Sequence, residues 1–185
     1  MQDGSYVDPS AELGRDVKIG RFCVIEAGVV LGDGATIEDH TTIRAGARIG
    51  SRTKIGIHSV VGAEALIGAD CSFTAYCEVR AKCQLGDRVS MGSRCTLSAG
   101  TVVGDDVIIK YGFVATDTPV LAESHNKAVC HLRSGSRYGA NVTIMPGVTV
   151  GIGSEIGACS QVRKDVPDGQ VWYGSPAKFH REAEV

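Results

Sequence analysis

The chain has 185 residues, of which 43% are hydrophobic but only 5% aromatic, and this length allows one domain with a continuous core. Its formal net charge of −2 argues against a general nucleic-acid binder or a protein held on anionic membranes. No apolar run approaches the length of a membrane span, and Met1–Gly20 lacks the basic-then-apolar layout of a secretion signal. We therefore expect a cytoplasmic protein with neither a membrane nor a nucleic acid as partner.

Residues 1–10 are predicted to be a lead-in, and a six-residue repeat begins directly after them. Stepping by six from Leu13 reaches only large apolar residues as far as Ile109, and the next step reaches Ala115. A six-residue period indicates a parallel β-helix, in which each hexad supplies one short strand and one corner. Three hexads would close one triangular coil of eighteen residues. We therefore predict an all-β fold whose first coils span residues 11–115.

The eighteen-residue period is visible separately in a column of glycines. Every third apolar residue of the hexad frame is followed by glycine, in the pairs Leu13-Gly14, Leu31-Gly32, Ile49-Gly50, Ile67-Gly68, Leu85-Gly86 and Val103-Gly104. Glycine tolerates backbone conformations that a Cβ atom forbids, so we expect these glycines to form a repeated corner. Successive coils should lie about 4.8 Å apart, which is the spacing of hydrogen-bonded strands.

A second inward position, two residues before each large one, holds small side chains that suit a narrow triangular core. Five of the seven cysteines occupy it, namely Cys23, Cys71, Cys77, Cys83 and Cys95. We expect buried, reduced thiols that act as small hydrophobic side chains. The chain has no Cys-x-x-Cys pair, so a zinc cluster is not expected. Cys130 and Cys159 lie outside this array, Cys130 in a stretch that reads as a loop, and neither is expected to have a chemical role.

His40 and His58 are one coil apart, so they should stack at the same corner of the β-helix. The same column continues with Tyr76, Arg94 and Gly112. Two interpretations stay open, a stacked surface ladder and a substrate-facing edge at a subunit boundary.

The hexad register breaks after Ala115. Residues 116–137 contain no recognised hexad, so this interruption of the repeat is predicted to be an extruded loop. Loops of this length are usually functional or disordered. The repeat resumes at Tyr138, which predicts final coils over residues 138–166. Pro167 and Pro176 then stop the strand pattern, and residues 167–185 are predicted to be a C-terminal extension with a short polar tail able to form a helical turn. Residues 1–185 would thus form a single domain of seven to eight coils.

Two local strings are more specific than the hexads. One is YGANVTIMPGVTVG, from Tyr138 to Gly151, and the other combines VRKDVP at Val162–Pro167 with GSPAK at Gly174–Lys178. With these strings the whole chain resembles the hexapeptide-repeat (left-handed β-helix) acyltransferase superfamily, and within it the nucleotide-sugar amine N-acetyltransferases. Ser175 stands where those strings usually carry asparagine. The resemblance implies a left-handed β-helix and a homotrimer with active sites between neighbouring chains.

The resemblance also implies acetyl-CoA as a co-substrate and no metal. Backbone amides near a bend in the strand ladder can hold the carbonyl groups of a pantetheine arm, and cations can hold the phosphates. The carried-over candidates for cofactor binding are Ala140, Asn141, Ser160, Arg163, Lys164, Pro176 and Lys178.

An amine acceptor must be neutral to attack a thioester, so a proton acceptor nearby would help. Sugar O-acetyltransferases of this superfamily carry a histidine before the proline that begins the loop, whereas this chain has Thr118 before Pro119. That difference disfavours an alcohol acceptor, whose pKa is far higher. Asp117 is the first candidate for a catalytic role, followed by His125 and His131.

The sequence thus predicts an acetyl-CoA-dependent N-acetyltransferase that acts on the amine of a nucleotide-linked amino sugar. A sugar O-acyltransferase and an acyl-carrier-protein-dependent acyltransferase are the alternatives. A γ-type carbonic anhydrase is less favoured, because His125 and His131 are six residues apart and that site needs two histidines five apart. A catalytically silent scaffold is also less favoured, because the cofactor strings are intact. The sugar, its nucleotide and the acyl group stay open.

Overall fold

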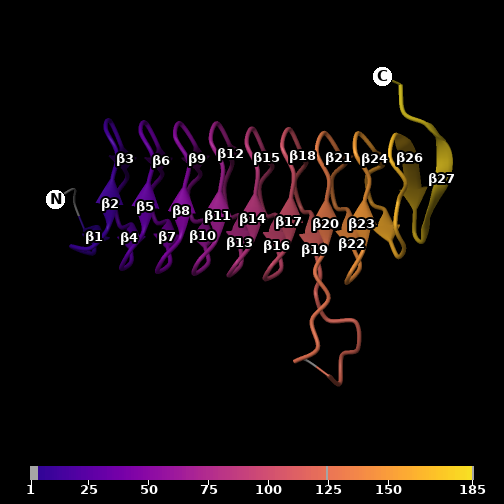
Figure 1. The fold of residues 1–185 in the computed structure, drawn as a ribbon, viewed down its shortest axis with the longest axis horizontal. Coiled ribbons are helices and arrows are strands. Elements are labelled where there is room, and N and C mark those ends of the chain that lie inside the picture. Colours follow the sequence, from indigo (N-terminus) through magenta and orange to yellow (C-terminus); the bar gives the residue numbers. More distant parts are fainter. Residues whose placement is uncertain (1–3, 124, 185) are drawn as a thin grey trace.

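The computed structural model describes residues 4–123 and 125–184, and every regular element in those residues is a β-strand (Figure 1). The strands form three sheets, here called A, B and C, which make up the three walls of a solenoid. Most strands pair with the strand one coil away, eighteen residues along the chain, as in the pairing of Leu13 with Leu31. Across the extruded loop the offset is longer, as in the pairing of Val103 with Leu132. The predicted all-β, parallel β-helix of hexapeptide repeats is therefore confirmed.

Sheets A and B begin at the N-terminal end of the solenoid. In the described residues, sheet A has nine strands in the order β1 (Tyr6–Val7), β4 (Val24–Ile25), β7 (Thr42–Ile43), β10 (Val60–Val61), β13 (Glu78–Val79), β16 (Thr96–Leu97), β19 (Val114–Ala115), β22 (Thr143–Ile144) and β25 (Gln161–Val162). In the same residues, sheet B has eight strands in the order β2 (Glu12–Leu13), β5 (Val30–Leu31), β8 (Arg48–Ile49), β11 (Leu66–Ile67), β14 (Gln84–Leu85), β17 (Val102–Val103), β20 (His131–Leu132) and β23 (Thr149–Val150).

Sheet C carries the C-terminal strands at its far edge. Its ten strands in the described part of the chain run in the order β27 (Ala177–Glu182), β26 (Gln170–Gly174), β24 (Glu155–Ile156), β21 (Arg137–Tyr138), β18 (Ile108–Ile109), β15 (Ser90–Met91), β12 (Ser72–Phe73), β9 (Lys54–Ile55), β6 (Thr36–Ile37) and β3 (Lys18–Ile19). The turns between sheets are called the A–B, B–C and C–A corners, by the sheets that each turn joins.

The described residues make about nine coils, more than the seven to eight predicted. The extra strands come from Val7 and Leu132, which lie on the six-residue frame but were not recognised as part of it. Because β19 ends at Ala115 and β20 begins at His131, the extruded loop spans residues 116–130 and not 116–137. Residues 6 and 7, expected in the lead-in, already pair with β4.

In residues 167–184 the C-terminal extension forms a β-hairpin and no helical turn. Strand β26 pairs in parallel with β24, and β27 then folds back to pair antiparallel with β26. The hairpin covers one edge of sheet C at the yellow end of the solenoid in Figure 1. Covering an edge strand limits pairing with other chains.

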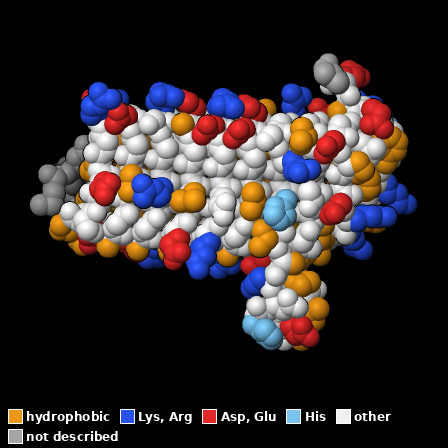
Figure 2. Space-filling view, in the orientation of Figure 1, with side chains coloured by type: hydrophobic (Ala, Val, Ile, Leu, Met, Phe, Trp, Pro, Cys, Tyr) orange, Lys and Arg blue, Asp and Glu red, His pale blue; other side chains and the backbone are white. Residues whose placement is uncertain are grey.

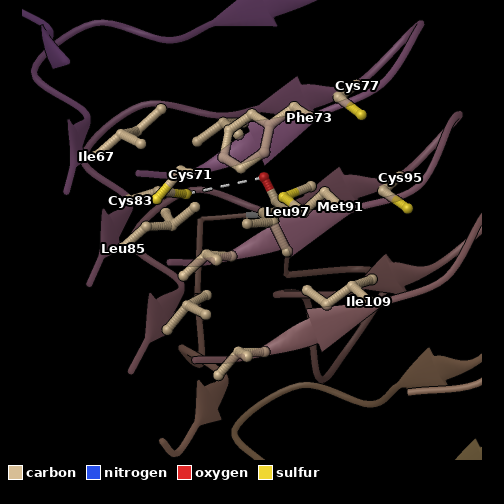
Figure 3. Close-up of a cluster of buried hydrophobic side chains, with 14 of the residues drawn as sticks. Ile67, Cys71, Phe73, Cys77, Cys83, Leu85, Met91, Cys95, Leu97 and Ile109 are labelled. Atoms are coloured by element: carbon tan, nitrogen blue, oxygen red, sulfur yellow. Dashed lines mark hydrogen bonds between the residues drawn. The ribbon is translucent and has the colours of Figure 1, made fainter. Parts of the chain in front are cut away.

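The core consists of the hexad residues together with the small inward residues between them. Figure 3 shows this arrangement around Phe73 and Met91, with thiols such as Cys71 and Cys83 lying among the large apolar side chains. The five cysteines predicted to be buried are buried and reduced, while Cys130, which reads as a loop residue in the sequence, is buried as well. Burial raises the pKa of the Cys77 thiol to about 11, so this thiol is a poor nucleophile.

The thiols of the small inward positions also donate hydrogen bonds. Each bonds the carbonyl oxygen of the corner residue fifteen positions along, as Cys83 does to Ser98 at 3.2 Å and Cys95 to Lys110 at 3.2 Å. The hydroxyl of Thr53 does the same with Gly68 at 2.7 Å. Cysteine and threonine at these positions therefore satisfy corner carbonyl groups that alanine would leave without this partner.

The glycine column has a different physical cause from the one expected. The left-handed backbone conformation falls on other corner residues, for example Phe22 and His40 with φ of 55° and 59°. A Cβ atom added to Gly50 would instead lie 2.4 Å from the backbone of Gly68 in the next coil. Glycine is thus required where adjacent coils approach each other, and its conformational freedom is not used there.

In residues 4–123 and 125–184 the chain forms no helix of the length and apolar character needed to cross a membrane.

Candidate functional site

The extruded loop leaves the solenoid at the A–B corner and is closed at its base by backbone contacts. The Ala128 N–H donates to the Asp117 carbonyl at 2.8 Å, and the Gly147 N–H donates to the Ala128 carbonyl at 3.1 Å. The Cys130 thiol donates to the Thr116 carbonyl at 3.1 Å. Figure 2 shows the loop projecting from the solenoid wall. Its base is therefore held against the corner that contains Gly147, which belongs to the first C-terminal string.

Asp117 lies in this loop base with 8% of its surface exposed. Its Oδ1 atom accepts hydrogen bonds from Thr118 Oγ1 at 2.8 Å and from Lys127 Nζ at 3.1 Å. Burial acts to raise the pKa of Asp117, but the hydroxyl of Thr118 and the ammonium group of Lys127 outweigh burial, so the pKa is lowered. The positive charge of Arg80, on the same corner, acts in the same direction.

Sequence reasoning missed Lys127. The sequence shows Lys127 only as a cation within the irregular loop, and no periodic pattern there relates it to Asp117. Its Nζ also donates to Thr118 Oγ1 at 2.8 Å. Lys127, Thr118 and Asp117 therefore form a compact polar cluster at the loop base.

The other two catalytic candidates lie in different surroundings. His125 is exposed in the distal part of the loop, and among the described residues the ion-pair partner of Asp117 is Lys127. His131 is exposed on β20 in sheet B, where it pairs with Val102 and Thr149 of the adjacent coils. The carboxylate and the two imidazoles therefore come from the base of the loop, its outer part and the wall beside it.

The cofactor candidates fall on two neighbouring corners of the last coils. Ala140 and Asn141 form the C–A corner after β21, and the Cys159 N–H donates to the Ala140 carbonyl at 2.8 Å. In an earlier coil the equivalent of Ala140 is Arg21, whose N–H donates to the Asp39 carboxylate at 2.8 Å. One coil after Ala140 the position of Asp39 is occupied by Ala158, which has no carboxylate. The backbone N–H of Ala140 therefore lacks the acceptor that Arg21 has.

The second string of cofactor candidates links the last coil to the hairpin. Ser160 is buried, and its Oγ accepts the Gly174 N–H at 3.0 Å. This bond joins the C–A corner to the segment that holds Pro176, which follows a cis peptide bond. The side chain of Ser160 is thus bonded within the fold, and its carbonyl accepts the Thr143 N–H at 2.9 Å, so the backbone N–H of Ser160 is the group left for a ligand.

The three cationic candidates are all exposed but do not lie together. Arg163 and Lys164 form the A–B corner after β25, and the Nε of Arg163 donates to Gln161 at 2.6 Å. Lys178 lies on β27 of the C-terminal hairpin. In residues 4–123 and 125–184, Lys164 and Lys178 form no ion pair, so both charges are available to an anion.

Metal ligands do not gather in the described part of the chain. No three His, Cys, Asp or Glu residues there lie close enough together to hold a metal ion.

Comparisons with known proteins agree with the repeat. Residues 10–45 match the family model described as bacterial transferase hexapeptide (six repeats), and residues 84–116 match that described as hexapeptide repeat of succinyl-transferase. A putative acetyltransferase of Staphylococcus aureus (strain Mu50) is 41% identical over 63 residues, which are 34% of this chain and 32% of that protein. A galactoside O-acetyltransferase of Lactococcus lactis is 38% identical over 69 residues, 37% of this chain and 33% of that protein. The matches therefore span about a third of each relative's length.

Solved structures extend the similarity to nearly the whole chain. A UDP-N-acetylglucosamine acyltransferase superposes with a TM-score of 0.85 at 22% identity, covering 95% of this chain and 71% of that one. The UDP-N-acetylglucosamine O-acyltransferase of Moraxella catarrhalis gives 0.71 at 20% identity, covering 96% and 75%. At these identities the similarity shows the fold, the left-handed β-helix. Together the hexad register, the two matched family models and this fold show that the chain is built from hexapeptide repeats of the bacterial transferase type and folds as a left-handed β-helix.

Proposed function

We propose that the protein is an acetyl-CoA-dependent N-acetyltransferase that acetylates the amine of a nucleotide-linked amino sugar. The observation that carries the proposal is the hydrogen bond between Gly147 and Ala128 at 3.1 Å. It joins the base of the extruded loop to the string that resembles the acetyl-CoA-binding end of such enzymes. The acetyltransferases among the sequence relatives support the same donor. A cytoplasmic location, where acetyl-CoA is made and used, remains a prediction.

The reaction is a direct attack of the neutral amine on the thioester carbonyl. A carbon–nitrogen bond forms, the carbon–sulfur bond breaks, and the sulfur leaves as the CoA thiolate. The proton lost by the amine passes through a protein group or water to that thiolate. Asp117, His125 and His131 are the proposed groups for orienting the amine or accepting its proton. The lowered pKa of Asp117 favours an orienting carboxylate, because a good general base has a pKa near the working pH.

A sugar O-acetyltransferase is the second candidate. It is favoured by the galactoside O-acetyltransferase of Lactococcus lactis, which is 38% identical over 69 residues. A substrate hydroxyl group needs a stronger general base than an amine does. In this candidate reaction His125 or His131 would be that base.

The test supplies the purified full chain with acetyl-CoA and pairs of nucleotide sugars that differ only in carrying an amino or a hydroxyl group. Thiol release and product mass are followed together. Release with the amino member alone supports the proposal, and release with the hydroxyl member alone supports the O-acetyltransferase. If neither member of any pair releases thiol above the rate of hydrolysis, the proposed function is wrong.

The proposed phosphate contacts predict a defect in cofactor binding. Replacing Arg163 or Lys164 with alanine should raise the KM for acetyl-CoA roughly tenfold, equivalent to about 1.4 kcal/mol, if each provides one charge-assisted contact. The kcat should change little, since binding that is equal in ground and transition states affects KM alone. Initial rates over a range of acetyl-CoA concentrations measure both constants. Arg133→Ala, an exposed arginine on the B–C corner, is the control. A fall in kcat at constant KM would contradict this mapping of the cofactor site.

We also propose a homotrimer, because closed symmetric oligomers are the usual assemblies of such chains. The loop supports this, since Leu121 is 90% exposed and Val120 46% exposed, and exposed apolar groups of this kind often mark a protein contact. Light scattering should give about three times the chain mass of 19.4 kDa.

The loop contact predicts that Leu121→Asp shifts the protein toward monomer at a given concentration. The control is Leu66→Asp, which puts the same charge at a 43% exposed leucine on sheet B. A monomeric parent protein at micromolar concentration, or equal effects of the two changes, would argue against a trimer held by the loop.

A further inference from the structure

The C–A corner carries a continuous ladder of exposed aromatic rings. The rings of Phe22 and His40 are 5.0 Å apart, those of His40 and His58 4.7 Å, and those of His58 and Tyr76 5.0 Å, with interplanar angles of 14° to 17°. The predicted stacking of His40 on His58 is therefore confirmed. Because three rings support it from one side, Tyr76 is held in a defined orientation at the end of the ladder.

Beyond Tyr76 the same corner column is hollow. The column continues through Arg94, Gly112 and Asn141, whose N–H groups each donate to the preceding corner, for example Asn141 to the Tyr111 carbonyl at 2.9 Å. A Cβ atom on Gly112 would lie 2.2 Å from Asn141 Oδ1. Because Gly112 has no side chain, the side-chain amide of Asn141 can lie over it. The result is a groove with a volume of about 500 Å³, a size suited to a small molecule.

The groove offers two aromatic rings and one free positive charge. Tyr76 is 53% exposed and Tyr111 60% exposed, and both line the groove together with Arg94. On the B–C corner, by contrast, Arg52 and Arg88 are each bonded to an aspartate of the next coil. Arg94 has Tyr76 and Gly112 as its neighbours in the column, and in the described residues it forms no ion pair.

We propose that this groove binds the nucleotide part of a substrate, a purine or pyrimidine base carrying phosphates. Tyrosine rings stack on bases regardless of their identity, and a guanidinium group binds phosphate oxygens through paired donors. The amide of Asn141 supplies a further donor and acceptor for a base edge or a ribose hydroxyl. No negative charge lies in this part of the column to repel the phosphates.

The inference rests on the proposed function and makes it more specific, because both substrates of that reaction carry a nucleotide. One source is the adenosine diphosphate part of CoA, and the other is the nucleotide of the sugar acceptor. Asn141 is already a candidate for the cofactor site, and the groove extends that site by three further residues, Tyr76, Arg94 and Tyr111. The same chemistry therefore recognises either source.

Calorimetric titration of the full chain with UDP, CoA and pantetheine tests the groove without any turnover. Arg94→Ala should weaken binding of UDP or CoA roughly tenfold, as the loss of one charge-assisted contact predicts. Tyr111→Ala should weaken it by a similar factor, while Tyr111→Phe keeps the stacking ring and most of the affinity. Arg133→Ala, at the exposed B–C corner, should leave every affinity unchanged, and thermal melting checks that each variant is folded.

The probes separate the two sources. Weakened UDP binding with unchanged CoA binding assigns the groove to the acceptor, and the reverse assigns it to the donor. If Arg94→Ala and Tyr111→Ala bind UDP and CoA as Arg133→Ala does, or if neither nucleotide binds, the inference is overturned. Nucleotide binding that depends on Arg94 in a protein that transfers no acetyl group would sink the proposed function and leave this site standing. Acetyl transfer that is unaffected by Arg94→Ala and Tyr111→Ala would support the proposed function and overturn the assignment of the groove.

Discussion

Replacing Gly56 with alanine should destabilise the protein by at least about 3 kcal/mol, toward the upper end of the cost of overpacking a core. A Cβ atom at this position would lie 2.0 Å from the Thr74 carbonyl oxygen and 2.5 Å from its carbon. Both atoms belong to the backbone of the next coil, so no side-chain rotation relieves the clash. For a chain of this size the melting temperature should fall by about 6–12 °C, as measured by circular dichroism or calorimetry.

Gly28→Ala is the matched control, since it makes the same chemical change at another corner. A Cβ atom there meets nothing within 4 Å, and the only cost is a left-handed backbone with φ of 66°. That cost is about 1 kcal/mol, or roughly 2–4 °C. Equal losses at Gly28 and Gly56 would mean that the approach of adjacent coils does not set the cost of a Cβ atom at Gly56.

The second large effect concerns the loop base. Asp117→Asn should lower kcat about 100-fold if the carboxylate accepts the proton or fixes the amine, with a smaller change in the KM for acetyl-CoA. The pH profile of kcat should change as well. Because Lys127 helps to lower the pKa of Asp117, Lys127→Met should raise that pKa. The acidic limb of the profile would then move to higher pH, since the carboxylate would be protonated at a higher pH than in the parent.

A purely structural role for Asp117 gives a different pattern. Asp117→Asn and Lys127→Met would then cause similar losses, because each breaks the same contact at 3.1 Å, and the acidic limb would stay in place. His125→Ala and His131→Ala test the two imidazoles in the same assay, with His180→Ala on the C-terminal hairpin as the control. If the replacements of Asp117, His125 and His131 all leave kcat and its pH profile unchanged, the proton acceptor lies elsewhere, for example a water molecule held by Asn141.

The sequence alone determined the solenoid, because a repeated coil imposes its period on the chain directly. Every sixth position from Leu13 to Ile109 carries a large apolar residue, and its strand pairs with a strand eighteen residues away, as Ile67 does with Leu85. The same reasoning predicted the buried cysteines and the stack of His40 on His58. These features depend only on position within the repeat, so counting residues was sufficient to find them.

The coil that carries the loop and the C-terminal end of the chain were harder to predict, because there the six-residue frame is interrupted or absent. The separation of Ile109 from Tyr138 is not a multiple of six, so the loop hid the hexad that ends at Leu132. The hairpin of β26 and β27 has no hexad at all, and pairing with β24 decided its structure. The cause of the glycine column also needed coordinates, since a close approach between coils leaves the same sequence pattern as an unusual φ angle.

The candidate site was determined only in part by the sequence. The two C-terminal strings identified the corners of Ala140 and Arg163, because those residues occupy fixed places in the repeat. The contact between Asp117 and Lys127 and the hollow beside Gly112 were decided by tertiary structure. A loop has no period that relates one residue to another, and a hollow depends on which side chains meet across adjacent coils. The Asp117–Lys127 contact and the hollow beside Gly112 therefore depend on packing in three dimensions, which no local sequence pattern specifies.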